Sequence, residues 1–272
     1  MVYLRRHYIH MQKIKDIIIE FWYFCIANAR ASYFGAFLLF LFLLTQNTPY
    51  LFGISRYDFI FLCAVIFQIC ALLFRFEKPK EFYVILIFHI LATIMEVFKT
   101  HPSIASWNYP QVTHAYFALG TVPLFTGFLY SAVGSYISRA FMFLKLTYHR
   151  FPSFVHLWTL STLIYVNFFT HHFVYDLRYV LFLYILFIFR NTRIHFQIYK
   201  KERSMPFLVS AFLTAGFLWI AENIGTFTNM WRYPNQTEYW KLVSADKVGS
   251  WFLLLILSFA LVSLIYKERI RR

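Results

Sequence analysis

Long apolar runs separated by short polar stretches dominate this chain. The runs fall at about 31–46, 57–74, 82–98, 117–138, 154–169, 179–190, 206–221 and 249–266. Because a helix needs about 20 residues to cross a bilayer, the shorter runs are expected to extend into flanking aromatic and polar residues. The pattern predicts an all-α polytopic membrane bundle of about eight transmembrane helices.

The stretch 154–190 decides between seven and eight crossings, since it contains neither Gly nor Pro. As one helix it would be roughly 55 Å long, against a hydrocarbon core of about 30 Å, and its middle, 170–178, is polar. With eight spans and the N-terminus inside, 20 of the 26 Lys and Arg residues are cytoplasmic and 6 are outside. With seven spans, 14 Lys and Arg residues are cytoplasmic and 11 are outside, and Arg178 lies within the membrane. The excess of basic residues in cytoplasmic loops therefore favours eight spans and cytoplasmic termini.

This topology predicts three regions: a cytoplasmic N-terminal segment over 1–30, one transmembrane domain over 31–266, and a cytoplasmic tail over 267–272. The first twenty residues lack the apolar segment and small-residue cleavage site of a signal peptide.

Composition agrees with a membrane protein. Apolar residues make up 60% of the 272 and charged residues 14%, against about 45–50% and 25% in soluble domains, which excludes a single-domain soluble enzyme and a disordered chain. The net charge of +14 is attributed to cytoplasmic loops and not to nucleic-acid binding. Cys25, Cys63 and Cys70 form no disulfide framework.

Two outer segments of the chain repeat each other. The first contains Glu96, Thr100, Trp107, Tyr109, Pro110, Thr113 and Tyr116, and the second contains Glu222, Thr226, Trp231, Tyr233, Pro234, Thr237 and Trp240. The offset is 124 from the Trp onward and 126 for the Glu and Thr pairs. We therefore expect two parallel four-helix halves, about 31–140 and 154–266, with a site at their interface.

Polar residues at helical spacing support an interior site. The stripe His89, Thr93, Glu96 and Thr100 is matched by Ser210, Thr214, Glu222 and Thr226. Because a carboxylate facing lipid is costly, both stripes should face the bundle interior or a wet cavity. Gly120, Gly127 and Gly134 recur at heptad spacing and predict a helix-packing face.

Glu96 and Glu222 are the main candidates for chemistry. They could share a proton, act as general acid and base, or bind a metal; the alternative is that each caps polar loop groups or pairs with Lys99 or Arg232. His171, His172 and Asp176 are further catalytic candidates, with His172 and Asp176 four residues apart, as a pair on one helix would be. The alternative is that Asp176 merely holds His172 at a helix end.

The other candidates concern substrate and metal. Arg56 and Arg178 could clamp an anionic group, or could instead pair with Asp58 and Asp176. The remaining candidate substrate-binding residues are Trp107, Tyr109, Asn223, Trp231 and Tyr233. A divalent metal is one candidate cofactor, with His172, Asp176, His101, Glu96 and Glu222 as its candidate ligands.

Several motifs are similar to those of a known family. They are Glu-x-x-Lys-Thr-His at 96–101, Ser-Trp-Asn-Tyr-Pro at 106–110, Gly-Thr-Val-Pro-Leu at 120–124, Asn-Phe-Phe-Thr-His-His at 167–172 and Trp-Ile-Ala-Glu-Asn at 219–223. Across nearly its whole length the chain resembles the YoaT-like bacterial membrane proteins (domain of unknown function 817), which implies a multi-pass protein of the bacterial inner membrane. Residues 96–124 also resemble carotenoid hydratases and lycopene-cyclase-type proteins, which implies an isoprenoid-like substrate.

The leading hypothesis is an enzyme with a site near the extracytoplasmic face that acts on a lipid or isoprenoid-like substrate. Glu96 and Glu222 would be acid and base, and Arg56 and Arg178 would position the substrate. The expected partners are the bilayer and this amphipathic substrate, not nucleic acid, and the oligomeric state stays open. A proton-coupled small-molecule transporter and a non-catalytic membrane scaffold remain the alternatives.

Overall fold

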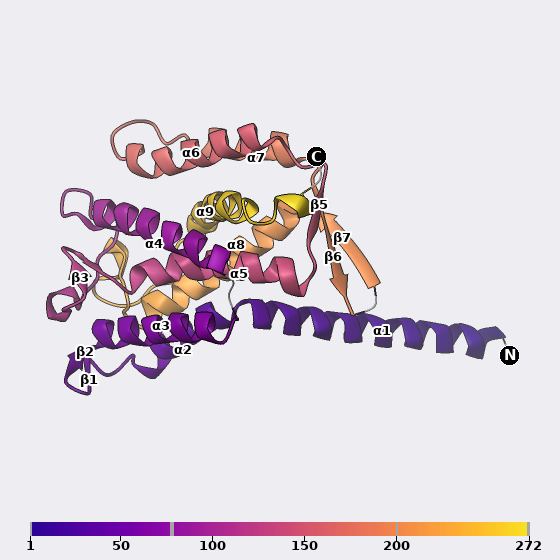
Figure 1. The fold of residues 1–272 in the computed structure, drawn as a ribbon, viewed down its shortest axis with the longest axis horizontal. Helices are drawn as coiled ribbons and strands as arrows, with labels where there is room; N and C mark the ends of the chain where they lie inside the picture. Colours follow the sequence, from indigo (N-terminus) through magenta and orange to yellow (C-terminus); the bar gives the residue numbers. More distant parts are fainter. Residues whose placement is uncertain (1, 77–78, 200, 271–272) are drawn as a thin grey trace.

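A computed structural model describes residues 2–76, 79–199 and 201–270, and several of its helices run along the long axis of the molecule (Figure 1). Within the described residues the helices are α1 (Val2–Ala31), α2 (Tyr33–Leu44), α3 (Arg56–Leu73), α4 (Pro79–Thr100), α5 (Thr126–Phe143), α6 (Phe154–Thr170), α7 (Arg178–Phe189), α8 (Phe207–Phe227) and α9 (Asp246–Ser263). Residue 1 of the predicted N-terminal segment and residues 271–272 of the predicted tail lie outside the described residues.

The predicted apolar segments correspond to helices α2 to α9, with one clear correction. The segment expected at 117–138 is helical only from Thr126, because residues before it form a hairpin of β3 (Ala118–Leu119) and β4 (Val122–Pro123). Gly120 adopts a positive φ of 60° in the hairpin turn, a conformation that glycine tolerates. Gly120 therefore does not share a helix face with Gly127 and Gly134.

Four helices within the described residues are long and apolar enough to cross a membrane: α3, the Phe82–Thr100 part of α4, α8 and α9. A fifth crossing is present if Ile14–Ala31 of α1 and Tyr33–Leu44 of α2, which meet at 73°, form one bent span. Helices α6 and α7 are apolar but shorter. The described part of the chain is thus mostly helical, with four or five candidate membrane-crossing helices.

Helices α5 and α9 pack against each other inside the bundle, with α4 against α5 and α8 against α9. Helices α2 and α6 pack on this pair in equivalent ways. Helix α2 packs on α5 and α8, and α6 packs on α9 and α4. The loops after α4 and α8 therefore lie near each other at the end of the bundle that carries β3 (Figure 1).

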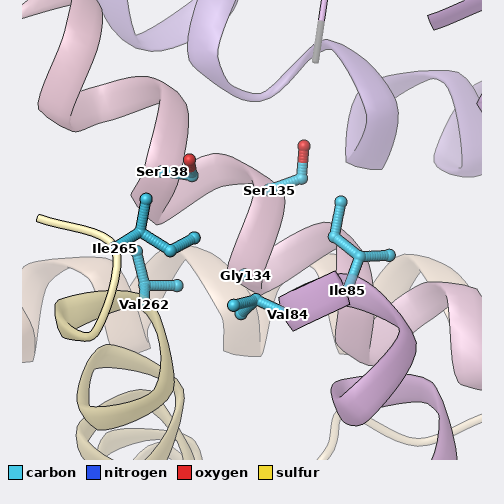
Figure 2. Close-up of a pocket in the computed structure, with 7 residues that line it drawn as sticks. All are labelled: Val84, Ile85, Gly134, Ser135, Ser138, Val262 and Ile265. Atoms are coloured by element: carbon cyan, nitrogen blue, oxygen red, sulfur yellow. The ribbon is translucent and has the colours of Figure 1, made fainter. Parts of the chain in front are cut away.

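Small residues of α5 allow the close approach of its neighbours. A Cβ atom on Gly127 would lie 2.4 Å from the ring of His89, and one on Gly134 would lie 2.8 Å from Phe88. Figure 2 shows Gly134, Ser135 and Ser138 of α5 between residues of α4 and residues at the C-terminal end of α9. The cavity there has a volume of about 10 Å³, room for no more than one water molecule.

A three-stranded sheet lies at the opposite end of the bundle (Figure 1). Its order is β5 (Thr147–His149), β6 (Arg193–Ile198) and β7 (Lys201–Pro206). Glu20 of α1 forms ion pairs of 2.6 Å with both Lys201 and Arg203 of β7. A further hairpin, β1 (Tyr50–Leu51) with β2 (Ile54–Ser55), joins α2 to α3. The apolar runs alone predict none of these strands.

Candidate functional site

Glu96 lies in the last turns of α4 and is only 2% exposed. Its Oε1 accepts a hydrogen bond of 2.6 Å from the Tyr130 hydroxyl of α5. Its Oε2 accepts one of 2.7 Å from the Tyr109 hydroxyl and one of 2.9 Å from Trp107 Nε1. Three donors from two segments therefore satisfy this buried carboxylate, as buried charge requires.

Glu222 occupies the corresponding position of α8 and is also buried. Its Oε1 accepts a hydrogen bond from the Tyr233 hydroxyl, and its Oε2 accepts one of 2.8 Å from Trp251 Nε1 of α9. A carboxylate has about four acceptor positions. Glu222 uses two of them and Glu96 uses three, so Glu222 has more capacity left for a ligand.

The two loop tyrosines act as hydrogen-bond donors over the whole physiological pH range. Burial raises the pKa of Tyr109 well above its usual value, and the charge of Glu96 raises it further. Burial likewise raises the pKa of Tyr233 well above its usual value, together with the charge of Glu222. Both phenols therefore keep their protons and donate to the carboxylates.

The loops that carry these tyrosines are joined through their backbones. Asn108 N–H donates to Arg232 O and Arg232 N–H donates to Asn108 O, each at 2.9 Å. The ring centroids of Trp107 and Tyr233 are 6.3 Å apart in an edge-on arrangement. The two glutamate sites consequently form one continuous structure and not two separate ones.

Both carboxylates line a cavity of about 880 Å³. Its polar end is lined by Glu96, Lys99, Ser106, Trp107, Tyr109, Tyr130, His171, Arg178, Glu222, Tyr233, Lys247 and Trp251. Apolar side chains such as Val133, Leu218 and Leu254 line the middle, and the lining continues to Phe24 of α1 and Phe196 of β6. The volume lies within the range of small-molecule sites, and the distribution of polar groups suits an amphipathic molecule.

Lys99, one turn after Glu96, joins the predicted histidines to this cavity. Its side chain is 5% exposed, and its Nζ lies 2.8 Å from His172 Nε2 and 3.3 Å from His171 Nε2. His171 Nδ1 lies 2.7 Å from the Asn167 carbonyl, so Nδ1 carries the proton and Nε2 accepts from Lys99. Burial, followed by the Lys99 charge, lowers the pKa of His172 to about 4, so this ring is also a neutral acceptor at pH 7.

Asp176 does not lie beside His172, because α6 ends at Thr170 and the intervening residues form a turn. Asp176 instead accepts from Asn167 Nδ2 at 3.0 Å and forms an ion pair of 3.2 Å with Arg178. Burial acts to raise the pKa of Asp176, but these hydrogen bonds and the Arg178 charge outweigh it, and the net pKa is lowered. The His172–Asp176 helical pair expected from their spacing is therefore wrong.

Arg56 lies away from the cavity lining and is fully buried. Its guanidinium donates to Phe42 O and Thr228 O at 2.7 Å each and to Thr45 Oγ1 at 2.9 Å. It thus caps the carbonyl ends of α2 and α8 and does not pair with Asp58, which holds the backbone N–H groups of Tyr116 and Phe117. Arg178, in contrast, lines the cavity.

The remaining predicted residues have distinct positions. Trp231 lines the cavity and packs edge-on against Phe42. Asn223 accepts from Val243 N–H at 2.9 Å and so fixes the loop before α9. His101 is exposed and contacts Ser103. Within the described part of the chain, no three His, Cys, Asp or Glu side chains come together as metal ligands would.

Five residues that line the polar end of the cavity were not among the predicted site residues: Lys99, Ser106, Tyr130, Lys247 and Trp251. Lys99 follows Glu96 by three residues, a spacing that places both near one helix face. Tyr130, Lys247 and Trp251 reach the site from other helices, so only the packing of α5 against α9 reveals them.

A family model described as "Protein of unknown function (DUF817)" matches residues 20–259. The chain is 37% identical over 253 residues to "Uncharacterized protein YoaT" of Bacillus subtilis (strain 168), an alignment that covers 93% of this chain and 92% of that protein. No solved structure matches the chain.

Proposed function

Since this chain belongs to the DUF817 family, whose described function is unknown, we propose a function from the site: it is an enzyme of the bacterial cell membrane that binds a lipid or isoprenoid-like amphipath. The apolar tail lies in the cavity and the head group reaches Glu222 and Glu96. The observation that carries the proposal is the distribution of the cavity lining, with two buried carboxylates at one end and apolar walls beyond them.

Glu222 is the proton acceptor in this proposal. Two of its acceptor positions are unused by protein donors, and both carboxylate oxygens are held in place by Tyr233 and Trp251. The carboxylate takes one proton from the substrate, becomes a carboxylic acid, and returns that proton to the substrate or to water. Glu96, held by three donors, fixes Tyr109 and Trp107 at the polar end of the cavity.

The same proposal includes eight membrane-crossing segments in two related four-helix halves, with the site at the extracytoplasmic end. The equivalent packing of α4 on α5 and of α8 on α9 supports two halves. So does the backbone pairing of Asn108 with Arg232, which are 124 residues apart, the offset of the repeat. Helices α6 and α7 are short and would cross a thinned part of the bilayer.

The test uses purified protein in lipid nanodiscs, incubated in ²H₂O with a total bacterial lipid extract. Untargeted mass spectrometry then records which lipid species change mass or abundance. Wild type is expected to change a discrete set of amphipathic species, by deuterium uptake or by conversion, and Glu222→Gln is expected to lose this change. Glu238→Gln, at an exposed position of the loop that follows α8, is the matched control and should behave as wild type. Identical spectra for wild type and Glu222→Gln would reject acid/base catalysis.

Proton-coupled transport is the second candidate, and the length of the cavity favours it. The lining extends from the polar end to Phe24 and Phe196, beside the sheet at the other end of the bundle. A transporter would move an amphipath across proteoliposomes in response to a proton gradient without altering its mass. Glu222-dependent flux combined with unchanged lipid mass would therefore replace the enzymatic proposal.

A further inference from the structure

The polar end of the cavity has hydrogen-bond donors left over. Lys99 has three N–H donors and places two of them on the neutral nitrogens of His171 and His172. Lys247 lies with its Nζ 4.2 Å from the ring centroid of Tyr233 and 5.7 Å from that of Trp107. Among the described residues, neither lysine nitrogen lies within 4.0 Å of a carboxylate oxygen.

The carboxylates nearby contact groups other than the lysines. Tyrosine hydroxyls and indole N–H groups occupy three of the about four acceptor positions of Glu96 and two of those of Glu222, and Asp176 is paired with Arg178. At longer range Glu96 and Asp176 attract the Lys99 ammonium, whereas Lys247 and Arg178 repel it. Glu222 attracts Lys247, and Arg178 repels it. No charge in direct contact therefore neutralises either lysine.

We propose that this end of the cavity binds a phosphate-bearing head group, with Lys99 and Lys247 as its two cationic ligands and Arg178 beside them. The inference rests on the proposed function, because it names the chemistry of the amphipath that the cavity holds. A phosphate monoester brings about −1.5 to −2 charges and three acceptor oxygens, which matches two lysines on separate helices, α4 and α9. A single carboxylate would offset only one of them.

The aromatic groups explain why the lysines stay in place without a ligand. The faces of Tyr233 and Trp107 hold the Lys247 ammonium by cation–π attraction. The two histidines hold Lys99 as neutral acceptors. Neither arrangement neutralises a lysine charge, so an arriving phosphate adds charge-assisted hydrogen bonds without breaking an ion pair of either lysine.

The test measures binding of dodecyl phosphate to the full chain in nanodiscs, by quenching of tryptophan fluorescence. Dodecanol and dodecyltrimethylammonium share its tail but present a neutral or a cationic head, and inorganic phosphate shares only its head. Dodecyl phosphate is expected to bind at least tenfold more tightly than the other three, with an affinity that falls as salt is raised.

The variants test the two lysines. Lys247→Gln and Lys99→Gln are each expected to lose about tenfold in affinity for dodecyl phosphate, and Lys247→Arg is expected to retain binding. Lys241→Gln, at an exposed lysine outside the cavity lining, should match wild type.

The possible failures are distinguishable. Equal binding of all three dodecyl compounds, or wild-type affinity in Lys247→Gln, would overturn the phosphate site while leaving the amphipath cavity intact. Inorganic phosphate binding as tightly as dodecyl phosphate would overturn a lipid source for the head group. Absence of binding by every dodecyl compound would reject the proposed function itself. Since Lys99→Gln removes a buried group, its loss of binding counts only if its melting temperature equals that of wild type. The binding result of Lys247→Gln tests the phosphate site without that condition.

Discussion

Asn108 and Arg232 exchange two backbone hydrogen bonds of 2.9 Å and so join the two loops that cover the buried glutamates. The bridge places Trp107 of one loop beside Tyr233 of the other, with ring centroids 6.3 Å apart. Each loop thus serves two purposes. It donates to the carboxylate that precedes it in sequence, and it contributes an aromatic side chain to the lining of the polar end of the cavity.

The indole ring of Trp231 packs directly against Gly225 and leaves no room for a side chain there. A Cβ atom there would lie 2.1 Å from the indole ring, and Trp231 is too buried to move aside. We expect Gly225→Ala to lower the free energy of unfolding by about 1–3 kcal/mol, measured as a lower melting temperature. Gly216→Ala on the same helix meets nothing within 4 Å and should not destabilise. Equal melting temperatures for the two variants would contradict the observed packing.

Arg56 is expected to contribute to the stability of the fold and not to ligand binding. Lysine cannot reproduce its three divergent hydrogen bonds, so Arg56→Lys should lose about 3 kcal/mol, corresponding to about two charged hydrogen bonds. Thermal unfolding measures this loss, with Arg193→Lys at an exposed position as the control. Dodecyl phosphate should bind folded Arg56→Lys within about twofold of wild type. A selective loss of affinity with unchanged stability would instead make Arg56 part of the ligand site.

The two glutamates should differ in what they contribute to stability. Glutamine in place of Glu96 offers an amide N–H₂ to three donors, and at least one charged hydrogen bond of about 1.5–3 kcal/mol is lost. Glu222 accepts only two hydrogen bonds, so its conversion to glutamine leaves fewer donors unsatisfied. Glu96→Gln should therefore melt at a lower temperature than Glu222→Gln, and the reverse order would contradict the assignment of Glu222 as the freer acceptor.

Low pH should weaken the contact between α4 and the turn after α6. Burial and the Lys99 charge lower the pKa of His172 from about 6.5 to about 4, so the unfolded chain binds more protons than the folded chain between these pH values. Stability is consequently highest above pH 6.5 and falls as pH decreases toward 4. Because the ring is partly exposed, solvent screening reduces the effect to about 1 kcal/mol.

The measurement for this effect is the melting temperature at pH 7 and at pH 4.5. Wild type is expected to lose about 2–4 °C more than His172→Gln over this interval. His101→Gln, at an exposed histidine, should follow wild type. A His172→Gln variant that is as pH-sensitive as wild type would show that the pKa of His172 is the same in the folded and the unfolded chain.

Much of the helical framework was predictable because long apolar runs carry it. Helices α2 to α9 fall on the predicted apolar segments, and the repeat around Trp107 and Trp231 led to both glutamates. The start of α5 was misplaced, since residues 117–125 are apolar enough to resemble a span although the turn at Gly120 folds them into a hairpin. Apolar character indicates burial in lipid or protein, and it does not distinguish a helix from a short hairpin.

The composition of the site was less predictable than its location. Glu96, Glu222, Trp107, Tyr109 and Tyr233 were identified because they recur at a fixed offset. Tyr130, Trp251 and Lys247 come from helices α5 and α9, whose sequences carry no repeated polar motif at these positions, and only their packing brings them to the carboxylates. Conversely, the spacing of His172 and Asp176 suggested a pair that the end of α6 prevents.

The most direct test of an amphipath in the cavity is photo-crosslinking with dodecyl phosphate that carries a diazirine at the end of its alkyl chain, followed by mass-spectrometric mapping. Adducts are expected on apolar cavity residues such as Val133, Leu218 and Leu254. They should disappear in Ala132→Trp, which fills the cavity, and persist in Leu183→Trp on the exposed face of α7. Adducts confined to outward-facing residues such as Phe187 and Phe212, unchanged by Ala132→Trp, would show that the amphipath stays in the surrounding bilayer and that the cavity does not bind it.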